Sequence, residues 1–192
     1  MKFVRDITWE EVFEGWRARE AQNQGWIACA KEKGWSDWEQ WRRFTASSID
    51  AQNRSWKLFV FDDPMQEISS MLIGPYTGWQ SRVENKNRTT FEDFLSSKSQ
   101  FSYFSTHKGV ASIVDGLPFS TEFIGVVRKD INKIVCLDGH HRATATALLL
   151  KQGRRVNFDE VKVTIALAEL PENECTILDE MVKRGTSKHP QG

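Results

Sequence analysis

The stretch Leu137-Asp138-Gly139-His140-His141-Arg142-Ala143 lies where one sequence pattern gives way to another. The apolar run before it, residues 133–137, is typical of a buried β-strand, and the run rich in alanine and leucine after it, residues 143–150, is typical of a helix. A strand that turns directly into a helix presents unpaired backbone N–H groups and the positive end of the helix dipole. We therefore expect an anion-binding site at this turn.

The side chains of the turn suit a phosphate or a carboxylate. Gly139 lets the backbone approach a ligand closely, and Arg142 can donate two parallel hydrogen bonds to a phosphate. Two adjacent imidazoles diverge by about 100° on a helix, so we expect one of His140 and His141 to face the ligand and the other to pack or cap. The sequence thus predicts phosphate binding by Gly139, His140, His141 and Arg142.

Asp138 has two interpretations. It can cap the helix by accepting hydrogen bonds from the N–H groups of His140 or His141, which is the commoner role for an aspartate in this position. It can instead act as a general base, or hold a magnesium ion beside a bound phosphate. On the second interpretation Asp138 and His141 are the candidate catalytic residues, and Asp138 is the candidate magnesium ligand.

The composition excludes several classes of protein. The 192 residues include 26 basic and 26 acidic ones, and this balance argues against a protein built mainly to bind nucleic acid. The three cysteines form no CxxC pair, which argues against a zinc ribbon or a disulfide framework, and Cys136 is expected to be a small core residue. No apolar stretch approaches the ~20 residues that cross a bilayer, and no signal-peptide pattern is present, so we expect a cytoplasmic protein without a membrane partner.

Seven of the eight tryptophans lie between residues 9 and 56. Capping-box patterns at Thr8 and Ser36 predict helices over about 9–22 and from Ser36 to about Ile49, with a shorter helix over 26–33 between them. We expect these tryptophans to fill a helical core. The alternative is an aromatic surface for bases, sugars or a partner, which includes a second copy of the chain.

The rest of the chain alternates strand and helix patterns, which predicts an α+β protein. Predicted strands cover residues 56–61, 123–128, 133–137 and 161–167. Predicted helices cover 108–115, 143–152 and about 173–183, with a short one after Thr89 or Thr90. Residues 66–73 fit a short helix or a strand, 74–79 an ordered loop, 96–100 a loop, and 185–192 a frayed tail.

Residues 134–145, with DGHHR followed by alanines, resemble the signature of the ParB/sulfiredoxin-like superfamily. The order of the predicted elements between residues 56 and 170 is also similar to that of the superfamily. The resemblance implies three parts: a helical, tryptophan-rich extension over 1–55, a ParB/sulfiredoxin-like domain with a small mixed β-sheet over 56–170, and a C-terminal helix and tail over 171–192.

The resemblance also implies a function. In this superfamily the motif loop and the helix N-terminus bind nucleotide phosphates, and Gly139, His141 and Arg142 fall on the phosphate-contacting positions. Asp138 falls where the free-serine kinase-like branch, the closest in motif, has an aspartate that looks catalytic. The ligands implied are ATP, ADP or CTP with magnesium, and the reaction implied is phosphoryl transfer to a small molecule or nucleotide hydrolysis.

Departures from the superfamily narrow this expectation. Sulfiredoxins carry their nucleophilic cysteine where this chain has His140, and only about 20 residues follow the last predicted strand, too few for the DNA-binding module of ParB proteins. The kinase branch also uses an upstream acidic residue, for which Glu67 and Glu84 are candidates. The second hypothesis is a non-catalytic binding or regulatory module that uses the tryptophan-rich helices as its partner surface.

Overall fold

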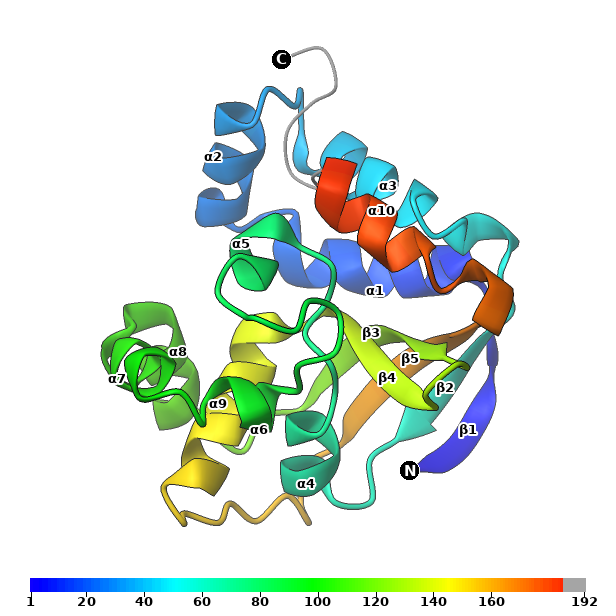
Figure 1. Ribbon diagram of the computed structural model, residues 1–192. Coiled ribbons are helices and arrows are strands. Elements are labelled where there is room, and N and C mark those ends of the chain that lie inside the picture. Colours follow the sequence, from blue (N-terminus) through cyan, green and yellow to red (C-terminus); the bar gives the residue numbers. More distant parts are fainter. Residues whose placement is uncertain (185–192) are drawn as a thin grey trace.

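A five-stranded mixed β-sheet organises the chain in the computed structural model, which describes residues 1–184 (Figure 1). The strand order is β1 (Lys2–Ile7), β2 (Trp56–Val60), β5 (Val163–Leu170), β3 (Thr121–Arg128) and β4 (Lys133–Asp138). Strands β5 and β3 run parallel, and the other neighbouring pairs run antiparallel. The predicted α+β class and the mixed sheet are thereby confirmed.

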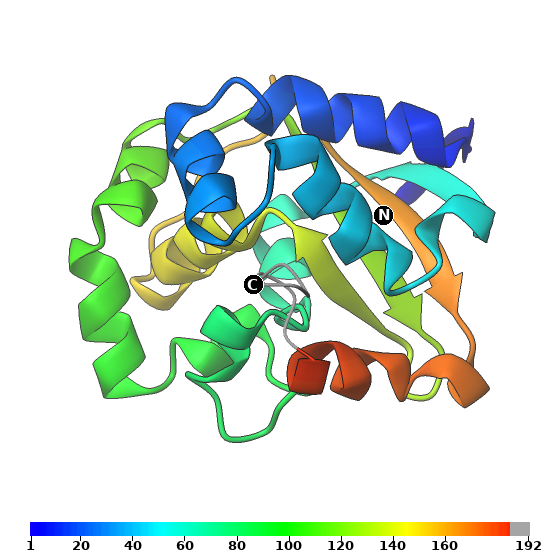
Figure 2. The same cartoon turned by 90° about the horizontal axis from the view of Figure 1, so that it is seen from above.

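Helices cover both faces of this sheet, as Figures 1 and 2 show. One face carries α1 (Trp9–Glu20), α3 (Trp38–Ser47) and α10 (Ile177–Arg184), with α2 (Gln24–Glu32) packed on α3. The other face carries α4 (Pro64–Ser69) and α9 (His140–Lys151), and around α9 lie α6 (Phe91–Phe94), α7 (Lys98–Thr106) and α8 (Lys108–Asp115). The remaining short elements are α5 (Thr77–Gln80) and the 3-10 turns Ala51–Asn53 and Glu172–Glu174. No helix of the described residues is long and apolar enough to span a bilayer.

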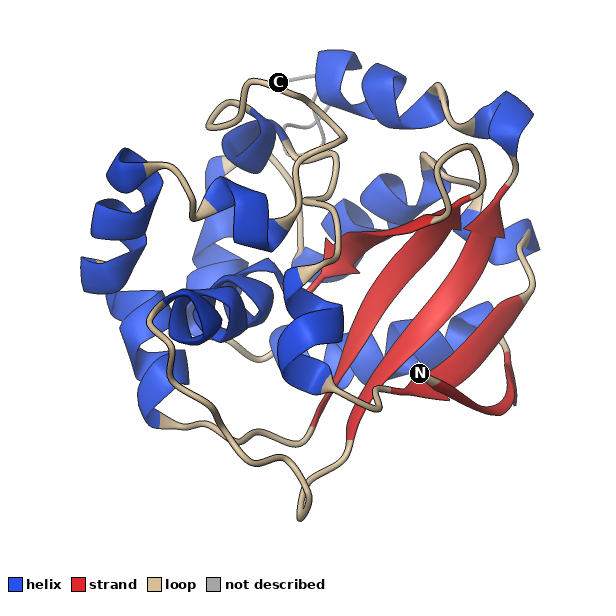
Figure 3. Ribbon diagram, turned by 60° about the horizontal axis from the view of Figure 1, so that its bottom comes forward, coloured by secondary structure: helices blue, strands red, loops and turns tan. Residues whose placement is uncertain are grey.

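Strand β3 shows why its sequence is a continuous apolar run. Side chains alternate across a sheet, and this sheet is covered on both faces. Phe123 packs in the cluster beneath α9, whereas Ile124 and Val126 pack in the cluster beneath α1 and α3. Figure 3 shows the sheet between its two helical layers.

The tryptophans form interior structure, as predicted. Six of the seven between residues 9 and 56 are buried: Trp9, Trp16, Trp35, Trp38, Trp41 and Trp56. Four of these belong to the cluster on the sheet, while Trp35 and Trp41 form a separate small cluster with Ala30. Trp26 is half-buried. These indoles therefore do not form an exposed partner surface.

The N-terminal segment is not purely helical, which corrects one expectation. Residues Lys2–Ile7 form an edge strand that pairs with β2, and α1 then packs directly on the sheet. Residues 2–6 of β1 are exposed, with Phe3 at 55%. An edge strand that buries so little has no inward-facing apolar periodicity to detect.

The structure also decides or corrects the predictions for several other segments. Residues 66–73 contain both of the alternatives, because α4 ends at Ser69 and Leu72 then bridges to β4 and to Thr90. The short helix α5 occupies the second half of the loop expected over 74–79, and α7 begins inside the loop expected over 96–100. The last helix starts at Ile177 after a 3-10 turn, and the tail predicted over 185–192 lies outside the described residues.

The backbone of Leu72 holds the segment between α4 and α5 beside strand β4, which leads into the motif. Its backbone N–H donates to the carbonyl of Ile134 at 2.7 Å, and its carbonyl accepts from the N–H of Cys136 at 2.9 Å. The outer edge of β4 is thereby paired, and the chain continues through Gly74 and α5 alongside the start of α9.

Candidate functional site

The predicted anion-binding turn lines a cleft of about 880 Å³. Asp138 ends β4, Gly139 follows, and α9 begins at His140, and all five residues of 138–142 contribute to the cleft wall. The rest of the wall comes from α1, α2, α3, α8, residues 76–79 and Leu137 at the end of β4. In Figure 1, α2 and α5 lie above α9. The structure therefore brings the motif together with the tryptophan-rich helices at one cavity.

The first turn of α9 has unpaired donors. Within residues 1–184, the backbone N–H groups of His140, His141 and Arg142 have no hydrogen-bond acceptor, and the helical pattern starts with the Ala143 N–H donating to the Gly139 carbonyl at 2.8 Å. No side chain caps this helix, so the expectation that Asp138 caps it is wrong. Three free donors at the positive end of a helix favour an anion in the cleft.

Gly139 is required by the turn itself. Its φ of 107° lies in the left-handed region that side chains disfavour, and a Cβ at this position would stand 2.3 Å from a ring carbon of Phe123. The glycine thus lets the strand turn into the helix directly above Phe123. The same backbone borders the cleft, which is consistent with the predicted close approach of a ligand.

His140 is the imidazole that packs. Its Nε2 accepts the backbone N–H of Gly74 at 3.0 Å, and its ring lies between Tyr76 and Trp79, with both ring centroids at 5.1 Å. Burial lowers the pKa of His140 to about 3, so the ring is neutral and serves as an acceptor. Only the backbone N–H of His140 remains for an anion, because its side chain holds the Gly74 loop in place.

His141 is the less buried of the two imidazoles at the cleft wall. Its ring stacks on that of His107 with centroids 5.5 Å apart, and the edge of Trp79 lies at 5.3 Å. Burial first, and then His107 and Arg142, lower the pKa of His141 to about 4. A neutral imidazole at neutral pH can donate or accept a hydrogen bond, or accept a proton. Both residues contribute to the cleft wall, but the ring of His140 packs against the Gly74 loop whereas that of His141 stacks on His107. Which of the two faces a ligand stays a prediction.

The lowered pKa values of His140 and His141 predict that the folded protein loses stability in acid. They stay neutral in the folded protein down to about pH 4, whereas in the unfolded chain they take up a proton below their ordinary pKa of 6.5. The two histidines therefore do not reduce the free energy of unfolding above pH 6.5. As the pH falls below 6.5 this free energy decreases, by roughly 2 kcal/mol at pH 5 for His140 alone. Urea unfolding at pH 7.5, 6 and 5 measures this. In His141→Gln the slope against pH should be shallower, and an unchanged slope contradicts the neutral assignment of His141.

Arg142 is held in place by its neighbours. One guanidinium nitrogen donates to Asp138 Oδ2 at 2.8 Å, the other donates to Thr121, and the group lies 5.0 Å from the centre of the Phe123 ring. Arg19 of α1 approaches the same oxygen at 3.4 Å. The guanidinium of Arg142 is thus committed on one side to an internal carboxylate, with the cleft open beside it.

Asp138 is a buried carboxylate between cations. Burial raises the pKa of Asp138, but Arg142 and Arg19 outweigh this effect and hold that pKa below its ordinary value. The carboxyl group is therefore ionised. From this position the carboxylate of Asp138 can orient the guanidinium groups of Arg142 and Arg19. Among the described residues no three His, Cys, Asp or Glu side chains are grouped so as to hold a metal ion. A magnesium ion would therefore depend mainly on the phosphates of its ligand, as is common for this metal.

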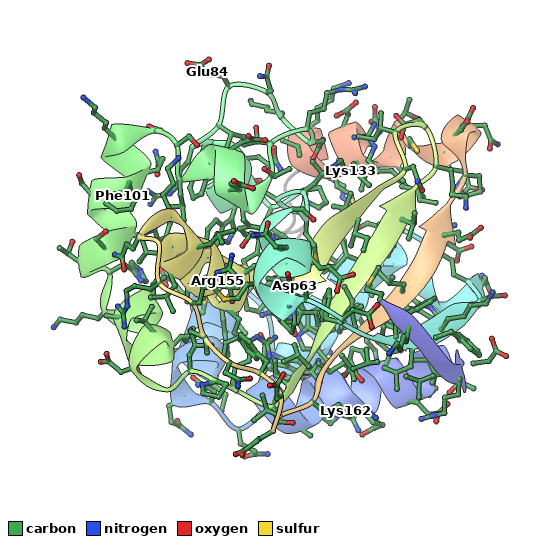
Figure 4. All side chains as sticks on the ribbon, turned by 90° about the horizontal axis from the view of Figure 1, so that it is seen from below. Asp63, Glu84, Phe101, Lys133, Arg155 and Lys162 are labelled. Atoms are coloured by element: carbon green, nitrogen blue, oxygen red, sulfur yellow. The ribbon has the colours of Figure 1, made fainter. Side chains whose placement is uncertain are left out.

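The two upstream acidic candidates are not at the cleft. Glu67 in α4 accepts the backbone N–H groups of Asp62 and Asp63, at 2.7 and 3.0 Å, and pairs with the amino terminus. Glu84 lies on the loop after α5, at the periphery of the molecule in Figure 4. Neither residue lines the cavity that contains the motif.

The structure adds four residues that sequence reasoning missed, namely Arg19, Glu20, Arg42 and His107. Glu20 Oε2 accepts from Arg42 at 2.6 Å, and the Arg42 guanidinium lies 4.1 Å from the centre of the Trp41 ring. His107 caps α8 by accepting the Val110 N–H at 3.3 Å. Each comes from an element remote in sequence from the motif, so no local pattern marks it. Of the described residues, four cations line the cleft against two carboxylates: Arg19, Lys33, Arg42 and Arg142 against Glu20 and Asp138.

No protein family model, curated protein or solved structure matches this chain.

Proposed function

We propose that this protein binds the phosphate groups of a nucleotide in the cleft, at the N-terminus of α9, in the manner of ParB/sulfiredoxin-like proteins. The observation that carries the proposal is the set of three unpaired backbone N–H groups, at residues 140–142, inside a cleft whose cations outnumber its carboxylates. Backbone donors and fixed positive charge together favour a multiply charged anion.

Three side chains at the cleft have a role in binding the anion. His141 supplies a neutral imidazole, Arg142 supplies the positive charge of a guanidinium that Asp138 and Thr121 hold in place, and Arg19 supplies a loosely held charge. The contacts of Arg19 to Asp138 and Glu122 are long, at 3.4 and 3.6 Å, so they can give way to a phosphate. Phosphoryl transfer or nucleotide hydrolysis is the reaction this arrangement suits, with His141 as proton acceptor and Asp138 fixing the guanidinium groups.

Isothermal titration with ATP, ADP, CTP and inorganic phosphate, with and without magnesium, tests the proposal. Binding of at least one nucleotide is expected, and His141→Ala and Arg19→Gln should each weaken it roughly tenfold, as expected for the loss of one charge-assisted or buried hydrogen bond. Arg155→Ala removes an exposed arginine outside the cleft and serves as the matched control. Absence of binding by every compound in wild-type protein overturns the proposal.

The alternative, a non-catalytic module with the tryptophan-rich helices as its partner surface, gains no support from the buried indoles. Nucleotide binding is the function that the cleft favours.

A further inference from the structure

The cleft is larger than a phosphate site requires. Its volume of about 880 Å³ lies in the range of pockets that enclose a whole drug-sized ligand. The motif accounts for one end, and the other end is lined from α2, α3 and the turn before α2. The residues of this far wall are Asn23, Gly25, Trp26, Cys29, Lys33 and Trp41.

The far wall is aromatic and cationic. Trp26 is half-buried and Trp41 is buried, and both indoles border the cavity. The Arg42 guanidinium lies 5.0 Å from the centre of the Trp26 ring, and the Lys33 ammonium lies 5.9 Å from that of Trp41. A wall of indoles fixed by cations suits a flat, electron-rich ring, since such a ring can stack on an indole or a guanidinium plane.

Trp79 connects this wall to the phosphate end. It comes from α5, it is half-buried, and its ring lies 5.1 Å from that of His140 and 5.3 Å from that of His141. Aromatic surface thus extends from the motif histidines toward α2 along one cavity.

We propose that the α2–α3 wall holds the nitrogen heteroaromatic base of a nucleoside phosphate whose phosphates lie at the N-terminus of α9. This inference rests on the proposed function and specifies its ligand class. Trp26 provides the stacking surface, and Lys33 and Asn23 border the ring. The N-terminal helices then supply half of the ligand site, in addition to their part in the core.

A comparison of ATP with inorganic tripolyphosphate tests the assignment. Wild-type protein should bind ATP more tightly than tripolyphosphate, because only ATP reaches the far wall. Trp26→Ala should weaken the binding of ATP roughly tenfold, as expected for the loss of one stacking contact, and should leave the affinity for tripolyphosphate unchanged. Phe3→Ala, which removes an exposed aromatic ring outside the cleft, should change neither affinity.

Cys29 provides a second measurement on wild-type protein, which needs no mutation. It is the half-buried thiol at the far wall, whereas Cys136 and Cys175 are buried. A thiol reagent should therefore label Cys29 first, and saturating ATP should slow this labelling at least fivefold while saturating tripolyphosphate does not.

The outcomes separate the two proposals. If ATP, ADP, CTP, inorganic phosphate and tripolyphosphate all fail to bind, the proposed phosphate site fails, and this inference fails with it. If both bind with equal affinity, or ATP leaves the labelling of Cys29 unchanged, the phosphate site stands and the base site is overturned. If Trp26→Ala weakens ATP and tripolyphosphate to the same extent, the effect lies in the fold of the cleft, and the stacking role is rejected.

Discussion

Gly139→Ala is expected to destabilise the protein by about 3 kcal/mol, the sum of two penalties. The first is the backbone conformation, since a φ of 107° is unfavourable for any residue with a Cβ. The second is steric, because the new methyl group would stand 2.3 Å from the Phe123 ring, which is itself completely buried and cannot move away. Urea unfolding monitored by circular dichroism measures the change.

Gly153→Ala is the matched control for this variant. Gly153 also has a positive φ, 70°, but no atom lies within 4 Å of the position that the new methyl group would take, so only the backbone penalty of about 1 kcal/mol applies. The difference between the two variants isolates the contact with Phe123. Equal losses in both would show that the turn can relax away from β3, and the fixed geometry of the anion site would then be in doubt.

Glu20→Gln is expected to cost about 3 kcal/mol, because it leaves a buried guanidinium without its counter-charge. Arg42 donates to Glu20 through Nε at 3.0 Å and through a terminal nitrogen at 2.6 Å, and both side chains are buried. Glutamine keeps an oxygen that can accept from Trp38 Nε1, which donates to Glu20 at 2.9 Å. The variant therefore tests mainly the charge.

A double-mutant cycle that combines Glu20→Gln with Arg42→Met tests whether the loss of stability comes from the Glu20–Arg42 ion pair. Methionine fills much of the space between the indoles without charge, so the double variant should be more stable than Glu20→Gln alone. Chemical unfolding of the four proteins gives the coupling energy. Additive losses would mean that the Arg42 charge is satisfied by the surrounding tryptophan rings, which lie 4.1 to 6.0 Å from it.

The sequence predicted those parts of the fold whose signal is local. The helix over 108–115 has the predicted bounds, and β4 differs by one residue, because an apolar stripe and a buried run are both complete within a few residues. The junction at 137–143 was predictable for the same reason. Helix geometry predicts that the side chains of His140 and His141 diverge, and their different neighbours, the Gly74 loop and His107, fit that prediction.

The parts that could not be predicted depend on contacts distant in sequence. Arg19 meets Asp138 across 119 residues, and Arg42 meets Glu20 from another helix, so neither pairing leaves a periodic signal. Asp138 was expected to cap the helix because that interaction is local. In the fold its carboxylate instead pairs with Arg142 one turn ahead and with Arg19, which only the packing of α1 on the sheet brings near.

The small cluster of Ala30, Trp35 and Trp41 gives the two sides of the cleft different freedom to evolve. Its three buried residues belong to neither of the two clusters that sandwich the sheet. A substitution in α2 away from Trp26, which also packs against the cluster beneath α1 and α3, therefore alters the far wall with little effect on the strands. The opposite side has no such independence, because Gly139 and Phe123 are in contact within the main core. Descendants of this chain could therefore diversify what they recognise through α2 while the turn before α9 stays constant.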